Sequence, residues 1–410
     1  MKVLEAFRSY QHIVRELIEN ITAKPTKWFV DFLIKLFDAV VAIPGKINFS
    51  SLSRYSGLSD RTFRNWYERQ ECDWLEFNRN AMLRSFGDDS EIVLAFDPAH
   101  ITKNGTSTYG IGRYWSGVEK RSKLGLEIMA FGAISLTRSK CMMLEAVQTP
   151  PARELHDEKT MTMLEWYLWL ITSQSARLHR ISDILTADAF FSRKPFIDGV
   201  VGTGFSFVGR LLPKQRLRYL ANESDMEQTQ HKKGRKFKYG GKIDPEAPDP
   251  HRTHPCHVKG ATKACWAIVN CVAMERNIKV VIAQHKVAGT VMYFSTDTTM
   301  DAEKIARIYQ LRFQIEFGIR DAKQYTGLND SQARGKERLD FAFNLSFAVR
   351  NILDILSTEI YHNISIGQLK SLLTKAYLVN LIRRKFGGRP NMRLIRELDS
   401  IIYGLIGVRA

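Results

Sequence analysis

Short apolar runs that alternate with helical segments are the feature of this sequence that most constrains its fold. Runs of strand-like composition lie at 91–97, 112–118, 124–136, 182–188 and 205–212. A long helix is expected over 159–178, between the third and fourth of these runs. Strands and helices interleaved in this order predict an α/β core, with a mixed β-sheet flanked by helices.

Helical patterns dominate both ends of the chain. Residues 1 to about 45 predict two amphipathic helices, which Pro44 and Gly45 end. Their apolar positions recur at helical spacing: Val14, Leu17 and Ile21, then Trp28, Phe32, Leu36 and Val40. Residues 338–383, rich in Leu, Ile and Phe, predict a helical tail with no sign of chemistry.

Residues 48–69 have the layout of a helix-turn-helix. A short helix over Ser50–Ser56 meets a turn at Gly57, and Ser59 can cap a second helix that carries Arg61 and Arg64. The second helix of such a motif enters the DNA major groove, so both arginines are candidate DNA contacts. The alternative is a plain helical hairpin that packs on the core.

Residues 213 to about 262 interrupt the alternating pattern. They include a basic run with interleaved aromatic residues, in which Lys232, Lys233 and Lys236 are candidate phosphate contacts. The alternative is a solvated charged face. Strand-like runs resume at 265–274, 278–285 and 291–297, so this region is predicted to be a β-rich insertion with a basic loop.

The segment 301–327 predicts one long helix with two neighbouring stripes. Placed at 100° per residue, Ile308, Leu311, Ile315, Ile319 and Ala322 form an apolar stripe. The adjacent stripe carries Tyr309, Arg312, Glu316 and Lys323. One face is therefore expected to pack on a sheet while the other lines a groove. Taken alone, the pattern also fits a surface helix with an Arg312–Glu316 ion pair.

Glu316 of the second stripe and two aspartates elsewhere in the chain together predict a metal site. Asp97 and Asp188 each end an apolar run, and Glu316 lies on the helix. Carboxylates that meet in this way hold hard cations through oxygen, with Mg²⁺ expected and Mn²⁺ as a substitute. Two such ions about 4 Å apart can clamp the attacking and leaving oxygens of a phosphodiester.

At these residues the sequence resembles a known family. Tyr309-x2-Arg312-x3-Glu316-x6-Lys323 matches the Y-x2-R-x3-E-x6-K (YREK) signature of one group of bacterial insertion-sequence DDE transposases. Asp97 in VLAFDPAH and Asp188 in ILTADAFF stand where that family has its first two catalytic aspartates. Pro-Ala-His follows Asp97, where members often carry a hydroxyl residue. The resemblance covers about residues 90–350.

The resemblance implies an RNase H-like fold and cut-and-paste transposition. Asp97, Asp188 and Glu316 would hold two divalent ions that activate water, and later the freed 3′-OH, for attack on DNA. Tyr309, Arg312 and Lys323 would grip phosphates at the transposon end. The implied partners are the double-stranded transposon ends and target DNA, with a homodimer in the DNA complex.

Related enzymes pass through a DNA hairpin in which a flipped base stacks on an aromatic side chain. Trp115, Trp166 and Trp266 are candidates for that role, although each is also a reasonable core residue. No motif chooses among them.

The expected organisation has five parts along the chain: a helical DNA-binding region at 1–88, the first part of the catalytic core at 89–212, the β-rich insertion at 213–290, the second part of the core at 291–335, and a C-terminal helical region at 336–410.

A His- and Cys-rich stretch at 251–265 raises the question of zinc. Its spacing, His-x2-His-x-Cys-His followed by Cys265, departs from the usual pairs of zinc ligands. Structural zinc is therefore the weaker interpretation.

Composition supports a nucleic-acid partner. The 410 residues include 60 Lys and Arg against 43 Asp and Glu, for a net charge of +17. Such an excess is typical of proteins that neutralise phosphates. The five cysteines form no disulfide framework. No apolar run approaches the ~20 residues of a membrane span, and no leader is expected, so a soluble, reducing compartment is predicted. The family resemblance implies that this is the bacterial cytoplasm, with the protein nucleoid-associated when DNA is bound.

Two rival functions remain open on sequence alone. One is a related metal-dependent nuclease that lacks strand transfer. The other is a catalytically silent DNA-binding protein derived from a transposase. The presence of all three carboxylates, together with the side chains of Arg312 and Lys323, favours an enzyme over the silent protein.

Overall fold

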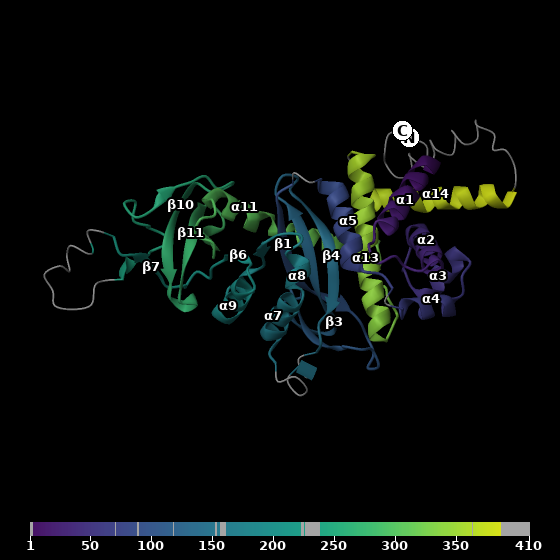
Figure 1. Ribbon diagram of the computed structural model, residues 1–410, viewed down its shortest axis with the longest axis horizontal. Coiled ribbons are helices and arrows are strands. Elements are labelled where there is room, and N and C mark those ends of the chain that lie inside the picture. Colours follow the sequence, from purple (N-terminus) through teal and green to yellow (C-terminus); the bar gives the residue numbers. More distant parts are fainter. Residues whose placement is uncertain are drawn as a thin grey trace.

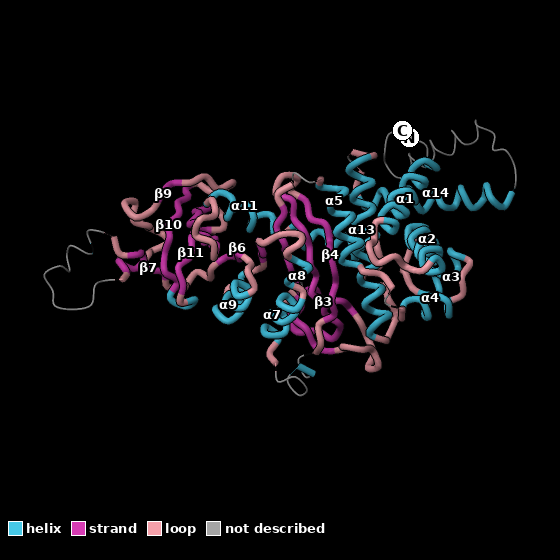
Figure 2. The backbone as a smooth tube through the Cα atoms, in the orientation of Figure 1, coloured by secondary structure: helices cyan, strands magenta, loops and turns pink. Residues whose placement is uncertain are grey.

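The computed structural model describes residues 3–69, 71–87, 90–117, 119–151, 154–155, 161–222, 225, 238–362 and 364–386. Three parts follow one another along its long axis (Figure 1). A β-rich part lies at one end, a mixed sheet with flanking helices lies in the middle, and a helical part lies at the other end (Figure 2).

The middle of the sheet has the strand order β4-β3-β1-β5-β6. Its strands are β1 (Ile92–Thr102), β3 (Arg121–Ser135), β4 (Lys140–Gln148), β5 (Ile184–Thr186) and β6 (Ser206–Arg210). The pairs β1–β3 and β3–β4 are antiparallel, whereas β5 and β6 run parallel to β1. The predicted mixed sheet is thereby confirmed.

The sheet continues from β6 into the β-rich end of the molecule. The strands there are β7 (Leu217–Leu220), β8 (Tyr239–Lys242), β9 (His254–Pro255), β10 (Lys263–Cys271), β11 (Arg276–His285) and β12 (Gly289–Ser295). β12 pairs with β6, so the segment after β6 is joined to the core edge to edge. With β2 (Gly112–Ser116) on β3, the described residues form one sheet of 12 strands.

Helices cover the middle sheet and build the other end. The helical end contains α1 (Val3–Glu19), α2 (Lys27–Ala42), α3 (Phe49–Ser56), α4 (Asp60–Tyr67), α5 (Trp74–Phe86), α13 (Lys336–Glu359) and α14 (Ile366–Phe386). Beside the middle sheet lie α7 (Met163–Ser173), α8 (Ser175–Leu178), α9 (Lys194–Gly202), α11 (Ala302–Arg312) and α12 (Gln314–Tyr325), with short 3₁₀ turns η1 (Ala189–Phe191) and η2 (Val272–Met274).

Two asparagines of α13 pair with the outer edge of β4. The Asn344 amide accepts from the N–H of Ala146 and donates to its carbonyl. Asn351 does the same with Met143. Buried backbone groups need such partners, so α13 closes an edge of the sheet that would otherwise be open to another chain.

Several predicted elements differ from the observed ones. β1 does not end at Asp97 but continues to Thr102, because the whole run pairs with β3. The helix expected over 159–178 is split into α7 and α8, and α7 starts after Thr162, which forms a capping box with Glu165. β4 carries no alternation strong enough to predict it from the sequence.

The first predicted helices are confirmed, with one misplaced residue. Helical spacing puts Trp28 in the apolar stripe of the second helix, but its side chain is 77% exposed. Phe32, Leu36 and Val40 are buried as predicted, Phe29 is buried with them, and Trp28 lies beyond the edge of this stripe.

Candidate active site

Asp97 lies on β1, and Asp188 follows β5, the parallel strand next to it. Asp97 is in the middle of β1, opposite Ala130 of β3. β1 pairs with β5 in a register that matches Ala95 with Thr186, so Asp188 follows β5 at the level of Asp97. Asp188 also caps η1, where its carboxylate accepts from the N–H of Phe190. Local capping and strand register together bring the two carboxylates to one place.

The segment 301–327 is not one continuous helix, contrary to the prediction. It breaks at Phe313, whose ψ of −7° departs from regular α-helical backbone, and α12 starts with a tight turn in which Glu316 N–H donates to the Phe313 carbonyl at 3.0 Å. The break lies between Arg312 and Glu316. Both side chains nevertheless point to a shared site, because Phe313 remains in the right-handed helical region.

Arg312 lies between two carboxylates. Its Nη2 donates to Glu316 Oε1 at 2.7 Å, and its Nη1 is 3.8 Å from Asp97 Oδ1. The Arg312 side chain is only 13% exposed, while that of Glu316 is 51% exposed. The pair is therefore more than the exposed helical ion pair that spacing alone suggests, because the guanidinium is buried and also faces Asp97.

The pKa of Asp97 responds to both of the other carboxylates, those of Glu316 and Asp188. Burial raises the pKa of Asp97 to about 7, an effect that Arg312 partly offsets and that Glu316 and Asp188 strengthen. Two neighbouring acids are thus close enough to disfavour ionisation of Asp97. A carboxylate that resists ionisation until a cation arrives suits a site for positive charge.

Tyr309 and Lys323 border the same site. The Tyr309 ring packs on Tyr293 with 5.4 Å between ring centres, and the Arg312 guanidinium lies 5.7 Å from its centre. Burial raises the pKa of the Tyr309 phenol, and Asp188 adds to that rise. Lys323 Nζ donates to the His100 carbonyl at 2.8 Å, and burial lowers its pKa.

The residues at this site fit a divalent cation in their chemistry, since all three donors are carboxylates. Within the described part of the chain, however, no group of three or more His, Cys, Asp or Glu side chains is close enough to enclose an ion. Arg312 occupies the space between Asp97 and Glu316. The buried Nε and Nη1 of Arg312 have no hydrogen-bond acceptor among the described residues, so these N–H groups are unpaired in the structure.

Three exposed phenylalanines border the carboxylates, and no sequence pattern predicted a role for them. Phe190 is 44% exposed beside Asp188, and Phe313 and Phe317 are 41% and 38% exposed on either side of Glu316. Phe313 and Phe317 meet edge to face at 5.1 Å. Their closeness in sequence to predicted catalytic acids was the available signal.

The helical pair at 48–69 is present as predicted. Gly57 ends α3 with a φ of 75°, and Ser59 caps α4 by accepting from the N–H of Thr62. Arg61 is exposed on α4, and Arg64 pairs with Asp60 at 3.1 Å. This geometry leaves DNA contact by the two arginines as a prediction. The other predicted contacts, Lys232, Lys233 and Lys236, lie outside the described residues.

The His- and Cys-rich stretch contains no metal-binding group among the described residues. His254 packs on the ring of Trp266 at 4.5 Å, across the pairing of β9 with β10. Burial raises the pKa of the Cys256 thiol to about 11, which opposes the thiolate form that zinc requires.

Comparison with known proteins places the chain in a family. Residues 141–352, more than half of the chain, match the Transposase DDE domain. The chain belongs to this DDE transposase family. The match includes Asp188 and the whole segment 301–327, while Asp97 precedes it.

One solved structure and the curated proteins complete the comparison. A structure of the piggyBac transposase synaptic complex with hairpin DNA is similar at a TM-score of 0.43 and 12% identity, over 98% of this chain and 85% of that one. No curated protein matches the chain. Within the described residues of this DDE transposase, no helix is long and apolar enough to cross a membrane.

Proposed function

We propose that this DDE transposase belongs to the YREK group of bacterial insertion-sequence enzymes and moves its element by cut and paste. The observation that carries the proposal is the position of Arg312 between Asp97 and Glu316, with Asp188 close enough to Asp97 to raise its pKa. The strand order β4-β3-β1-β5-β6, antiparallel and then parallel, supports an RNase H-like core.

Asp97, Asp188 and Glu316 would hold divalent metal, Mg²⁺ or in its place Mn²⁺, at a two-metal site. Such ions lower the pKa of a bound water and stabilise the charge that develops at phosphorus. The carboxylates would bind and orient these ions.

Arg312, Tyr309 and Lys323 would bind the phosphates of the transposon end. Arg312 has unused N–H donors, and a charge-assisted contact to phosphate is about twice as strong as a neutral one. Tyr309 orients that guanidinium by packing against it.

The proposed partners are transposon ends and target DNA, bound by a homodimer in the bacterial cytoplasm at the nucleoid. If a hairpin forms, Trp115 is the best placed of the three candidate tryptophans to stack on a base. It is 64% exposed, whereas Trp166 is buried and Trp266 packs against His254.

The test uses the purified full chain, Mg²⁺ and a duplex carrying the terminal sequence of the element that encodes it. Transposition predicts cleavage at the end and joining of the freed 3′-OH to a target plasmid. Cleavage without joining would identify a nuclease. Binding without cleavage would identify a silent DNA-binding protein.

A further inference from the structure

A basic cleft of about 650 Å³ lies where the helical end of the molecule meets the core. Its walls come from the segment before α3, from α4, from the loop after β1 and from the segment between α12 and α13. The cations that line it are Lys46, Arg64, Lys103, Arg334 and Arg338. Asp330 is the one acidic residue in its lining, and its carboxylate accepts from the N–H of Ile47 at 3.0 Å.

The cations of the cleft differ in how far they are already satisfied. Arg64 pairs with Asp60, Arg338 pairs with Glu68 at 2.8 Å, and Lys103 donates to the carbonyls of Ser331 and Ala333. Lys46 and Arg334 are exposed, and no ion pair involves either of them within the described residues. Two positive charges therefore face the cleft without an internal partner.

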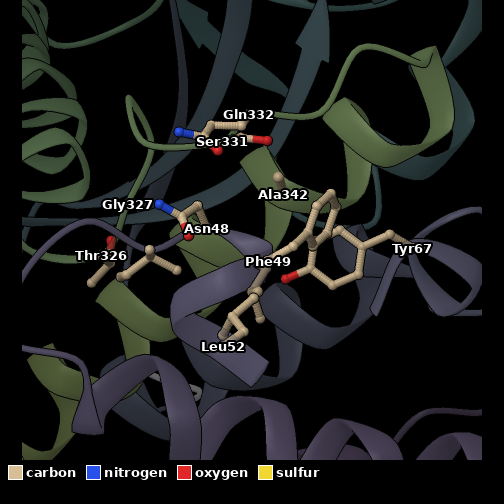
Figure 3. A pocket seen from close by; sticks show the side chains of 11 residues that line it. Asn48, Phe49, Leu52, Tyr67, Thr326, Gly327, Ser331, Gln332 and Ala342 are labelled. Atoms are coloured by element: carbon tan, nitrogen blue, oxygen red, sulfur yellow. The ribbon is translucent and has the colours of Figure 1, made fainter. Parts of the chain in front are cut away.

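A separate, smaller cavity lies beside the cleft and shares Ser331 and Gln332 with it. Figure 3 shows Phe49 and Leu52 of α3 beside Tyr67, facing Thr326, Gly327 and the loop at Ser331. The cavity enclosed there is only about 20 Å³, too small for more than a water molecule. Gly327 has a φ of 88°, and a Cβ in its place would lie 2.8 Å from Ile47. This tight contact holds Lys46 against the loop that carries Arg334.

The N-terminus of α13 adds to the positive potential. This 24-residue helix begins after Gly335, directly beyond Arg334, and no side chain caps it. The free N–H groups and dipole at such a terminus favour a bound anion.

The lining also indicates what kind of anion fits. All residues that line the cleft are described, and none of them is aromatic. Single-stranded nucleic acid is usually held by bases stacked on aromatic rings, whereas a duplex presents its phosphates outward. The cleft is therefore suited to the backbone of a duplex.

The cleft lies at a defined spacing from the carboxylates. Asp97 and Lys103 are six residues apart along β1 and its continuation, which corresponds to about 20 Å at ~3.3 Å per residue. Lys323 bonds to the carbonyl of His100, between these two positions. A duplex whose axis runs along this direction advances ~3.4 Å for each base pair, so about six base pairs of axial length separate the two sites.

We propose that this cleft binds duplex DNA through backbone phosphates, about six base pairs along the duplex axis from the phosphodiester held at the carboxylates. The inference rests on the proposed function, because the carboxylates define where the DNA end lies. Lys46 and Arg334 supply the phosphate contacts, and the terminus of α13 reinforces them.

The first test compares two double variants of the full chain. Lys46→Gln/Arg334→Gln removes the free cations of the cleft, and Lys35→Gln/Arg180→Gln removes two exposed charges elsewhere. With a labelled duplex of random sequence, the cleft variant should flatten the dependence of log affinity on log salt by about 2, at ~0.9 for each phosphate contact. Equal slopes for the two variants would overturn the proposal.

The second test locates the contact. Neutral methylphosphonate linkages are placed in both strands about six base pairs from the end of the duplex, or about twelve base pairs away as a control. Wild-type protein should lose affinity only for the first duplex, and the cleft variant should no longer discriminate between them. An equal loss of affinity for both duplexes would overturn the proposed position of the contact along the duplex. Binding of inorganic phosphate without any change in duplex affinity would show a small-anion site instead.

These results can be separated from a failure of the proposed function. If wild-type protein cleaves the end duplex but the cleft variant behaves as its control does, only this inference fails. If wild-type protein neither cleaves nor joins DNA while the slopes differ as expected, the cleft binds DNA and the transposase assignment fails.

Discussion

The carboxylate site and the basic cleft treat charge in opposite ways. At the carboxylates, Arg312 is buried and contacts both Asp97 and Glu316. In the cleft, Lys46 and Arg334 are exposed and have no ionic partner among the described residues. The first site carries its own counter-charge and is organised before any ligand arrives. The second depends on a ligand to balance its charge.

This difference has an energetic consequence. Burying charged groups costs free energy that an internal partner only partly offsets, so the carboxylate site is expected to lower stability. Exposed cations cost little and are screened by salt. Changes at the first site should therefore affect mainly catalysis, with a dependence of stability on pH, whereas changes in the cleft should affect DNA affinity alone.

The largest effect is expected from the carboxylates. Asp97→Asn, Asp188→Asn and Glu316→Gln each remove an anionic donor that supplies several kcal/mol of transition-state stabilisation through the bound cation, about 10³-fold in rate or more. Cleavage of the end duplex should be abolished while its binding is nearly unchanged. Asp31→Asn, an exposed acid on α2, serves as the matched control. Wild-type cleavage by any one carboxylate variant would remove that residue from the site.

Arg312 and Lys323 should show the next largest effect. If both grip phosphate, Arg312→Ala and Lys323→Ala should each slow cleavage by about 10–100-fold, since a charge-assisted contact contributes about 1.5–3 kcal/mol. The melting temperature should stay within a few degrees, because Asp97 can take up a proton when Arg312 is gone. Melting and cleavage are measured on the same preparations. A large drop in stability, with cleavage falling only in proportion to the folded fraction, would show a structural role.

Stability should depend on pH through Asp97. Its pKa is raised to about 7, so the folded state holds a proton that the unfolded state releases near pH 4. The free energy of unfolding should therefore fall as pH rises from about 4 to about 7, by ~1.4 kcal/mol for each unit of raised pKa. Denaturant unfolding in EDTA, compared with Asp97→Asn, isolates this contribution from those of Glu127 and Glu145, whose pKa values burial also raises to about 7. If the free energy of unfolding changed with pH in the same way for wild-type and Asp97→Asn protein, this prediction would be contradicted.

The smallest effect is expected from the single cations that the sequence predicts to contact DNA. Neutralising Arg61 and Arg64, or Lys232, Lys233 and Lys236, should flatten the salt dependence of DNA binding by about one unit for each cation that touches a phosphate. Arg61 has the clearer expectation, because Arg64 is already paired with Asp60. If the salt dependence of binding is unchanged for either set, the cations of that segment do not contact phosphate and form a solvated charged face.

Much of the fold was predictable because apolar periodicity is a local property. The strands at β5, β6, β10 and β11 coincide with predicted runs, as do the helices at both ends. β4 was missed because its edge is completed by Asn344 and Asn351 of α13, about 200 residues away. No local pattern in 140–148 contains that information.

The sequence by itself determined which residue types share a face. The spacing of Tyr309, Arg312, Glu316 and Lys323 specifies one side of a helical segment, and this survives the break at Phe313 because that residue keeps a helical φ. The apolar runs before Asp97 and Asp188 likewise specify strands.

Only the tertiary structure decided how those groups meet. The contact of Arg312 with Asp97 joins residues more than 200 positions apart, and the raised pKa of Asp97 depends on burial that no local pattern encodes. The cleft likewise combines Lys46 with Arg334, which the contact of Gly327 with Ile47 holds together. Helix and strand periodicity follow from short-range backbone geometry, but charge proximity and burial depend on how distant segments pack.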